Sequence, residues 1–250
     1  MVPLPLAVLV LVPGLALGSF LGVVASRVPL RRSIVYPGSA CLGCGTTVAW
    51  HDNIPLLSFL LLRGHCRHCR APIPWRDPAV ELVTALLVTG CVLSFGFTGE
   101  AAVAALGCAA LVVLAATDLE HRIVPNRIVL PAAAAVLALH TAVSPSPEWA
   151  LAAAGCAAVL FLVALAYPGG LGMGDVKLVL LIGAMVGRAA PLALMLGTLL
   201  ALVPSAVLFA RHGAAARKLA IPFAPFLALG AVIALFAGDR LLHVYFGAFT

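Results

Sequence analysis

The sequence predicts an all-α polytopic membrane protein with about eight transmembrane helices. Hydrophobic residues make up 63% of the 250-residue chain and charged residues only 10%, whereas soluble domains are about 25% charged. A helix needs about 20 apolar residues to cross the hydrocarbon core of a bilayer, and apolar runs between turn residues supply such segments. The predicted spans are residues 3–26, 79–98, 101–117, 128–143, 149–167, 176–187, 190–210 and 219–238.

The count depends most on residues 176–210, which form an almost continuous apolar stretch. A single helix of that length would measure about 52 Å, more than a bilayer core requires. We therefore predict a tight hairpin from Arg188 to Pro191. Residues 1–26 could instead be a signal peptide, but no Lys or Arg precedes Arg27, so we interpret them as a span.

The positions of the basic residues predict the orientation, because cytoplasmic loops retain Lys and Arg. With the amino terminus outside, most of the 15 basic residues fall on the cytoplasmic side. Only Arg188 and Arg240 fall outside. The net charge of +6 is then explained by topology, and nucleic-acid binding is not expected. The residues predicted inside are Arg27, Arg31, Arg32, Arg63, Arg67, Arg70, Arg76, Arg122, Arg127, Lys177, Arg211, Arg217 and Lys218.

Two aspartates are predicted at the same membrane depth. Asp118 ends the third span and Asp175 begins the sixth, both on the predicted cytoplasmic side. An Asp at a helix centre costs about 2.5–3.5 kcal/mol of insertion free energy and less near the interface. The presence of each aspartate at a helix end therefore needs an explanation. Asp118 could simply be a solvated helix end, since Glu120, His121 and Arg122 follow it.

A glycine-rich segment precedes Asp175. Gly172 and Gly174, with Gly169 and Gly170 before them, remove side chains from the backbone there. Glycine lets another backbone approach closely, and a substrate segment could lie extended beside this loop. The alternative is a flexible turn with Asp175 as a helix N-cap. Lys177 could favour ionisation of Asp175, or its cation could extend to the membrane interface.

Two aspartates that meet would share one proton over a wide pH range, because like charges repel. The ionised carboxylate can then remove a proton from water while the protonated one donates to a peptide carbonyl. This is the chemistry of aspartic proteases.

The loop between the first two spans contains two CxxC units, Cys41 with Cys44 and Cys66 with Cys69, separated by 21 residues. Paired CxxC units are typical of a tetrahedral four-thiolate zinc site. Disulfides are disfavoured because the arginines place the loop in the reducing cytoplasm. His65 and His68 are possible substitute ligands, and Cys91, Cys108 and Cys156 are expected to be packing residues within spans.

A loop of about 50 residues is too small for a sizeable core, so we predict a small zinc-stapled cytoplasmic domain. The predicted organisation is a first transmembrane helix at residues 1–27, the four-cysteine domain at 28–77 and a transmembrane peptidase core at 78–250. Because four thiolates close the coordination sphere, we expect the zinc to be structural and not catalytic.

Taken together, these motifs resemble the type IV prepilin peptidases, also called leader peptidase/N-methyltransferases. Their order and spacing carry the resemblance over nearly the whole chain. The matching positions are the four cysteines, Asp52 to Ser58, Leu62 to Gly64, Pro74 to Glu81, Asp118 with Pro125-Asn126, Gly172 to Asp175 with Lys177-Leu178, and Ile221 to Phe226.

The resemblance implies a GxGD-type intramembrane aspartic protease of the bacterial inner membrane that removes basic leaders at the cytoplasmic face. Its substrates would be type IV prepilins and pseudopilins of pilus or type II secretion systems. Asp118 and Asp175 match the catalytic pair, and Gly172, Gly174, Lys177 and Glu81 are candidate substrate-binding residues. Glu81 could instead pair with Arg76. The resemblance also implies structural zinc and N-methylation by S-adenosylmethionine.

The sequence departs from the family's pattern at two positions. Leu42 stands where many relatives have proline, and Asn126 stands where many have aspartate. No glycine-rich loop after a predicted strand offers a dinucleotide-type pocket for the methyl donor. Methylation therefore rests on the resemblance, and a peptidase without it remains an alternative.

Two other classes of function remain open. A membrane thiol oxidoreductase would use the CxxC pairs but leave the aspartates unexplained. A zinc or proton transporter would use the aspartates as a relay, although ionisable residues deeper in the spans are then expected. His140, expected at the outer interface, and Glu148 lie too near the outer side for that role.

Overall fold

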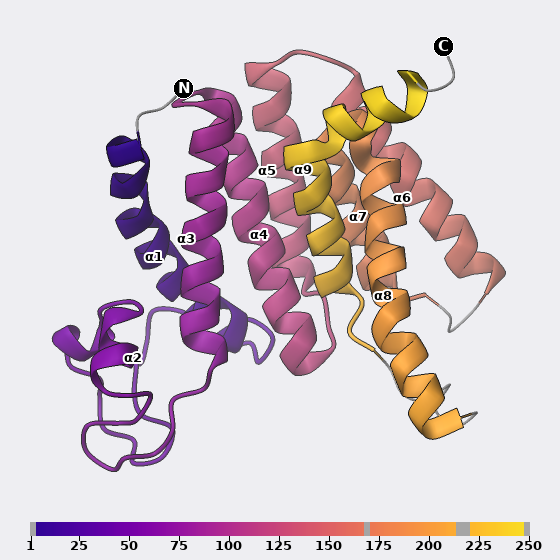
Figure 1. Cartoon of the computed structure of the whole chain (residues 1–250). Coiled ribbons are helices and arrows are strands. Elements are labelled where there is room, and N and C mark those ends of the chain that lie inside the picture. Colours follow the sequence, from indigo (N-terminus) through magenta and orange to yellow (C-terminus); the bar gives the residue numbers. More distant parts are fainter. Residues whose placement is uncertain (1–3, 168–170, 214–220, 248–250) are drawn as a thin grey trace. The chain divides into compact units, whose positions relative to one another are not determined.

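The computed structural model describes residues 4–167, 171–213 and 221–247, and the described chain is helical without a β-strand. The chain divides into two compact units, Met1–Ala116 and Thr117–Thr250, and each is described by itself. The boundary falls within one helix, α4, so the covalent chain passes from one unit to the other without a linker (Figure 1).

The first unit contains α1 (Leu4–Arg27), the short helices η1 (Trp50–Asn53) and α2 (Leu57–Leu61), α3 (Arg76–Phe95) and most of α4 (Gly99–His121). Figure 1 shows α1 beside α3. Two glycines of α1 permit this contact: a Cβ on Gly14 would lie 2.8 Å from the Cα of Ala85, and one on Gly18 would lie 2.6 Å from the Cα of Glu81. Small residues at membrane helix interfaces allow such close packing.

The second unit contains the end of α4, α5 (Asn126–Val143), α6 (Glu148–Ala166), α7 (Met173–Val186), η2 (Gly187–Ala189), α8 (Ala190–His212) and α9 (Ala224–Gly247). Helix α7 forms its core and packs against α5 and α6. Its side chains Leu178, Val179, Leu181 and Ile182 have no exposed surface. A Cβ on Gly183 would lie 2.5 Å from the Cα of Ala153, so α6 and α7 touch along their backbones.

The predicted break between the sixth and seventh spans is confirmed. Among the described residues, seven segments are long and apolar enough to cross a membrane, and one of them, Met173–His212, is 40 residues long. The structure divides that segment at η2, where Gly187 has a φ of +53°, a conformation that glycine adopts without strain. Helix α8 then packs on α9, where a Cβ on Gly230 would lie 2.6 Å from the backbone nitrogen of Gly197. The all-α polytopic architecture is as predicted.

Several predicted helix ends were wrong. The last helix begins at Ala224, not at 219, and continues to Gly247, beyond the predicted end at 238. Pro222 precedes the helix and Pro225 is its second residue, a position that tolerates proline. Past the charged pair Asp239-Arg240 the helix continues through largely apolar residues. Helix α4 likewise extends past the predicted span, to His121. Hydropathy identifies the part of a helix suited to the membrane, whereas the helix itself ends where its backbone hydrogen bonds end.

The predicted orientation and the three-part domain organisation stay predictions. Arg217 and Lys218, which contribute to the charge asymmetry, and Gly169 and Gly170 lie outside the described residues.

Candidate functional site

Asp118 lies in the last turn of α4 and is only 7% exposed. Its Oδ2 accepts a hydrogen bond of 2.9 Å from the backbone N–H of Ala224, and the N–H of Phe223 also donates to the carboxylate. The first N–H groups of a helix have no partner within that helix. Asp118 therefore caps the amino end of α9 from a different helix, and the alternative of a solvated helix end is wrong.

Asp175 is the third residue of α7 and is partly buried. Gly172 is the N-cap of this helix, and its carbonyl accepts the N–H of Asp175 at 3.0 Å. The N–H of Gly172 in turn donates to the Asp175 carboxylate. An acidic residue at the third helical position that binds back to the N-cap N–H is half of a capping box. The alternative that Asp175 is itself the N-cap is therefore wrong.

The two aspartates lie close enough for their charges to interact. The chain between α4 and α5 makes this possible by packing against the first turn of α7. A Cβ on Gly174 would lie 2.9 Å from the Cβ and 3.2 Å from the Cγ2 of Val124, so a side chain at position 174 would collide with the loop that follows Asp118. A Cβ on Gly172 would lie 3.2 Å from Oδ2 of Asp175. Gly174 thus provides close approach, as expected, but to the protein's own loop.

Lys177 is not directed at Asp175. Its ammonium donates to Oδ1 of Asn126 at 2.9 Å, which joins α7 to the first residue of α5. This contact gives Asn126 a structural partner. The pair is solvent-exposed, so it holds the two helix ends together at the surface.

Sequence reasoning missed the backbone of Phe223 and Ala224 as the partner of Asp118. The segment from Ile221 to Phe226 contributed to the resemblance but received no role. A signal was present, because proline at 222 and 225 marks a helix start, and a helix start carries unpaired N–H groups that favour a carboxylate. The sequence does not indicate which carboxylate binds these N–H groups.

Glu81 lies in the first unit, in the second turn of α3. Its Oε2 accepts the N–H of Leu56 at 2.7 Å, and the hydroxyl of Ser19 also donates to this carboxylate. The guanidinium of Arg76 instead lies 3.0 Å from Oδ1 of Asp77. The structure thus uses Glu81 to join the loop before α2 to α1 and α3.

The four cysteines of the loop come together. The sulfur atoms of Cys41, Cys44, Cys66 and Cys69 all lie within 4.8 Å of one another, and those of Cys41 and Cys69 are 3.6 Å apart. A tetrahedral zinc ion with Zn–S bonds of about 2.3 Å places its sulfurs about 3.8 Å apart. The arrangement therefore fits a four-thiolate metal site, and neither His65 nor His68 belongs to the cluster.

The two cysteine turns share one backbone design. Gly45 donates its N–H to the carbonyl of Cys41 at 2.9 Å, and Arg70 donates to the carbonyl of Cys66 at 3.0 Å. Both residues have positive φ, +71° and +58°. This conformation is ordinary for glycine and costly for arginine, so the second turn holds its geometry against local strain.

The surroundings shift the pKa values of three of these thiols, and not all in the same direction. The hydroxyl and backbone of Thr46 lower the pKa of Cys44 to about 6. The N–H groups of Cys69 and His68 lower the pKa of Cys66. The N–H of Ala71 also lowers the pKa of Cys69, but burial and the neighbouring thiols outweigh it and raise that pKa to about 12. Four crowded thiols cannot all ionise without a cation among them.

The remaining cysteines and His140 have packing roles. Cys91 and Cys108 are completely buried with their sulfurs 3.9 Å apart, and Cys156 is partly exposed. His140 is only 6% exposed, and its expected position at the outer membrane interface stays a prediction. Its ring stacks on Trp149 at a centroid distance of 4.1 Å, and its Nδ1 lies 2.8 Å from the carbonyl oxygen of Ala184.

A cavity of about 540 Å³ in the second unit lies away from the aspartates. Its lining includes Glu148, Gly187 and Arg188, at the opposite end of α7 from Asp175. With a rise of 1.5 Å per residue, that end is about 20 Å from the aspartate. The cavity is not part of the candidate catalytic site.

Family comparison finds two matches. Residues 12–95 match the Bacterial Peptidase A24 N-terminal domain, and residues 105–210 match the Type IV leader peptidase family. The first range contains the cysteine cluster and Glu81, and the second contains both aspartates.

Several curated relatives carry the name prepilin leader peptidase/N-methyltransferase. The one from Bacillus subtilis is 36% identical over 93% of this chain and 94% of its own length, and the one from Pseudomonas aeruginosa is 32% identical over 97% and 94%. The one from Myxococcus xanthus is 50% identical, over 53% of this chain and 40% of its own length. No solved structure matches the chain. With two family matches that together span most of its length and full-length relatives above 30% identity, this multi-pass membrane protein belongs to the type IV leader peptidase family.

Proposed function

We propose that the chain is a membrane endopeptidase that removes the basic leader from type IV prepilins and pseudopilins. The observation that carries this proposal is the pairing of Asp118 and Asp175 in the second unit, at the ends of two helices distant in sequence. The names of the full-length relatives supply the substrate class.

In the proposed reaction, Asp118 is the base. It already accepts backbone N–H groups at the amino end of α9, where the positive end of the helix dipole favours a negative charge. Asp175 then carries the proton that the pair shares. Asp118 takes a proton from water as the water oxygen attacks the scissile carbonyl carbon, and Asp175 donates its proton to the carbonyl oxygen. The tetrahedral intermediate, a gem-diol, then collapses: the C–N bond breaks, the proton on Asp118 passes to the leaving amine, and Asp175 takes a proton back from one of the hydroxyl groups. This leaves a carboxylic acid and an amine and restores the starting protonation of the pair.

The surroundings of Asp175 suggest how a substrate binds. Gly172 is exposed at the N-cap of α7, and its bare backbone offers a surface on which an extended peptide can reach the carboxylate. Gly174 and Lys177 act through Val124 and Asn126 and so position Asp175. Glu81 positions the loop of the first unit and, through that loop, contributes to substrate binding.

The orientation belongs to the same proposal. The basic loops predict that Asp118 and Asp175 face the cytoplasm of a bacterial inner membrane. A leader rich in Lys and Arg stays on that side, so the scissile bond would lie near the inner interface.

The cysteine cluster would hold a structural zinc ion through Cys41, Cys44, Cys66 and Cys69, since the sulfur spacing suits that ion. A bound zinc ion would cross-link a loop that has no hydrophobic core of its own. N-methylation of the new amino terminus by S-adenosylmethionine is also proposed from the relatives' names, and we assign no residue to the methyl donor.

The test is cleavage of a synthetic peptide that has a basic leader, a Gly-Phe junction and an apolar helix. The purified protein is incubated with this peptide and S-adenosylmethionine, and the products are weighed by mass spectrometry. We expect cleavage after Gly by the native protein, its loss in Asp118→Asn, and an added methyl group on the product. Asp239→Asn is the matched control, because Asp239 is an exposed acid that pairs with Arg188. An intact peptide with folded, zinc-loaded protein would contradict the proposal, and cleavage without methylation would identify a peptidase alone.

A further inference from the structure

The short helix α2 exposes three leucines on one face. Leu57, Leu60 and Leu61 are 49%, 62% and 73% exposed, and their spacing of i, i+3 and i+4 places them on one side of a helix. Ser58 lies off this face, is only 6% exposed and has two hydrogen-bond partners, and Phe59 on the opposite side packs on Trp75. An apolar helix face that the described part of the chain leaves exposed indicates an interaction surface.

Contacts fix this helix beside the place where α3 enters the membrane. The N–H of Leu56, the residue just before α2, donates to Glu81 in the second turn of α3. The ring of Phe59 lies edge-on to Trp75, the residue just before α3, at a centroid distance of 5.5 Å. The apolar span of α3 begins at Arg76. The leucines are therefore held at the level of the membrane surface.

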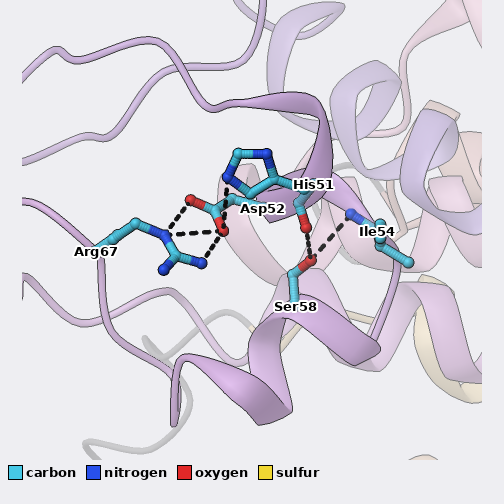
Figure 2. A network of polar contacts seen from close by, with 5 residues as sticks. All are labelled: His51, Asp52, Ile54, Ser58 and Arg67. Atoms are coloured by element: carbon cyan, nitrogen blue, oxygen red, sulfur yellow. Dashed lines mark hydrogen bonds and ion pairs between the residues drawn. The ribbon is translucent and has the colours of Figure 1, made fainter.

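A polar network on the other side fixes how α2 is turned (Figure 2). The hydroxyl of Ser58 donates to the carbonyl of His51 at 2.9 Å and accepts the N–H of Ile54 at 3.0 Å. Asp52, next to His51, is bound by two guanidinium nitrogens of Arg67, with distances down to 2.6 Å. These contacts connect α2 to the second cysteine turn and leave the leucine face directed away from the network.

The charges nearby favour lipid over a basic peptide as the partner. Arg63 follows α2 almost directly and is exposed, as are Arg31 and Arg32 after α1. Arginine at a membrane surface is attracted to anionic phospholipid headgroups, whereas a basic leader would be repelled. The indoles of Trp50 and Trp75 are 82% and 78% exposed, as is typical of side chains that lie among headgroups.

We propose that α2 is an interfacial helix that inserts Leu57, Leu60 and Leu61 into the acyl region of a phospholipid leaflet, with the neighbouring arginines among the headgroups. This gives the cysteine domain a membrane contact in addition to those made by α1 and α3. The inference does not depend on the proposed peptidase activity, because it concerns only the surface of the first unit.

Tryptophan quenching by brominated lipid tests the position of this face. The chain has three tryptophans, and replacing each with Phe gives a background for Leu60→Trp. Leu42→Trp is the matched control, because Leu42 is a leucine of the same domain that is 90% exposed and lies off α2. The full-length protein is reconstituted in vesicles of phosphatidylethanolamine and phosphatidylglycerol with brominated or ordinary acyl chains.

We expect the tryptophan at position 60 to emit at shorter wavelength than the one at 42 and to lose most of its emission in brominated vesicles. Equal responses at the two positions would overturn the proposal. So would a position-60 signal that ignores brominated lipid but shifts when a prepilin peptide is added, because that would identify the peptide as the partner.

A second measurement covers the case in which the tryptophan-free background does not fold. A photoreactive phenylalanine analogue replaces Leu60 in the otherwise native chain, and the irradiated protein is weighed. A mass increase equal to one phospholipid is expected at position 60 and not at 42. Crosslinking to peptide alone, or none to lipid, would contradict an interfacial α2.

Discussion

The backbone N–H of Ala224 donates to Oδ2 of Asp118 across 2.9 Å, although 106 positions separate the two residues. This contact fixes the carboxylate of α4 at the amino end of α9. It also satisfies an N–H group that the helix itself leaves unpaired. The geometry of the proposed catalytic pair thus depends on a backbone atom that no side-chain substitution removes, except substitution by proline.

We expect Ala224→Pro to lower kcat by about ten- to hundredfold, because a hydrogen bond to a charged group contributes about 1.5–3 kcal/mol. Proline is tolerated at the first position of a helix, so α9 can still begin at this residue. Ala224→Gly keeps the N–H and is the matched control. Initial rates at several peptide concentrations separate kcat from KM. Equal kcat in the two variants would show that the N–H of Ala224 does not position Asp118.

Gly174→Ala should abolish most cleavage without preventing membrane insertion, since its Cβ would lie 2.9 Å from the Cβ of Val124. The loop would have to move, and Asp118 and Asp175 would separate. Val124→Gly removes both atoms that collide, so the double variant should regain activity relative to Gly174→Ala. Failure of this second substitution to restore any cleavage would contradict the steric explanation. The assay is the same peptide cleavage, normalised to inserted protein.

The cysteine cluster should bind about one zinc ion per chain. Cys66→Ser and Cys69→Ser should each lose it, whereas Cys156→Ser, a cysteine of α6 outside the cluster, should retain it. Atomic absorption on purified protein gives the ratio of metal to chain. Unchanged zinc in the two cluster variants would exclude this site.

Zinc retention should depend on pH through Cys44. Several hydrogen bonds, of which the one with the hydroxyl of Thr46 contributes most, lower the pKa of this thiol from 9.0 to about 6. The stability that its thiolate contributes is therefore complete above pH 9 and is lost as the pH falls through about 6. Thr46→Val removes the hydroxyl and should raise the pKa. The variant should therefore release zinc at a higher pH than the native protein, as a chromogenic chelator would report. Release at the same pH would show that Thr46 does not tune the thiol.

The sequence was sufficient to predict the helical membrane architecture, the break near Arg188 and the assembly of the four cysteines. Each of these depends on a local pattern: an apolar run of sufficient length, a turn within it, or cysteine pairs at metal-binding spacing. The helix ends were predicted less well, because α4 ends in polar residues and α9 continues past the charged pair Asp239-Arg240, just before which the predicted span ends.

The contacts of the candidate site could not be predicted from the sequence, because they join segments that are distant along the chain. Nothing in the local pattern pairs Asp118 with Ala224, Glu81 with Leu56, or Gly174 with Val124. His140 shows the same limit: its place near a helix end does not indicate that its ring stacks on Trp149 or that its Nδ1 lies beside the carbonyl oxygen of Ala184. Charge and hydropathy indicate which segment a residue belongs to, whereas tertiary packing decides its partner.

The central claim is that Asp118 and Asp175 act as one catalytic unit, and a double-mutant comparison tests it most directly. Initial cleavage rates are measured for Asp118→Asn, Asp175→Asn and the double variant, with equal amounts of inserted protein. Each single variant should lose about a thousandfold or more, and the double variant should be no slower than the singles, because residues that act as a unit are not additive. Cleavage near the native rate in either single variant, or losses that multiply in the double variant, would contradict the account.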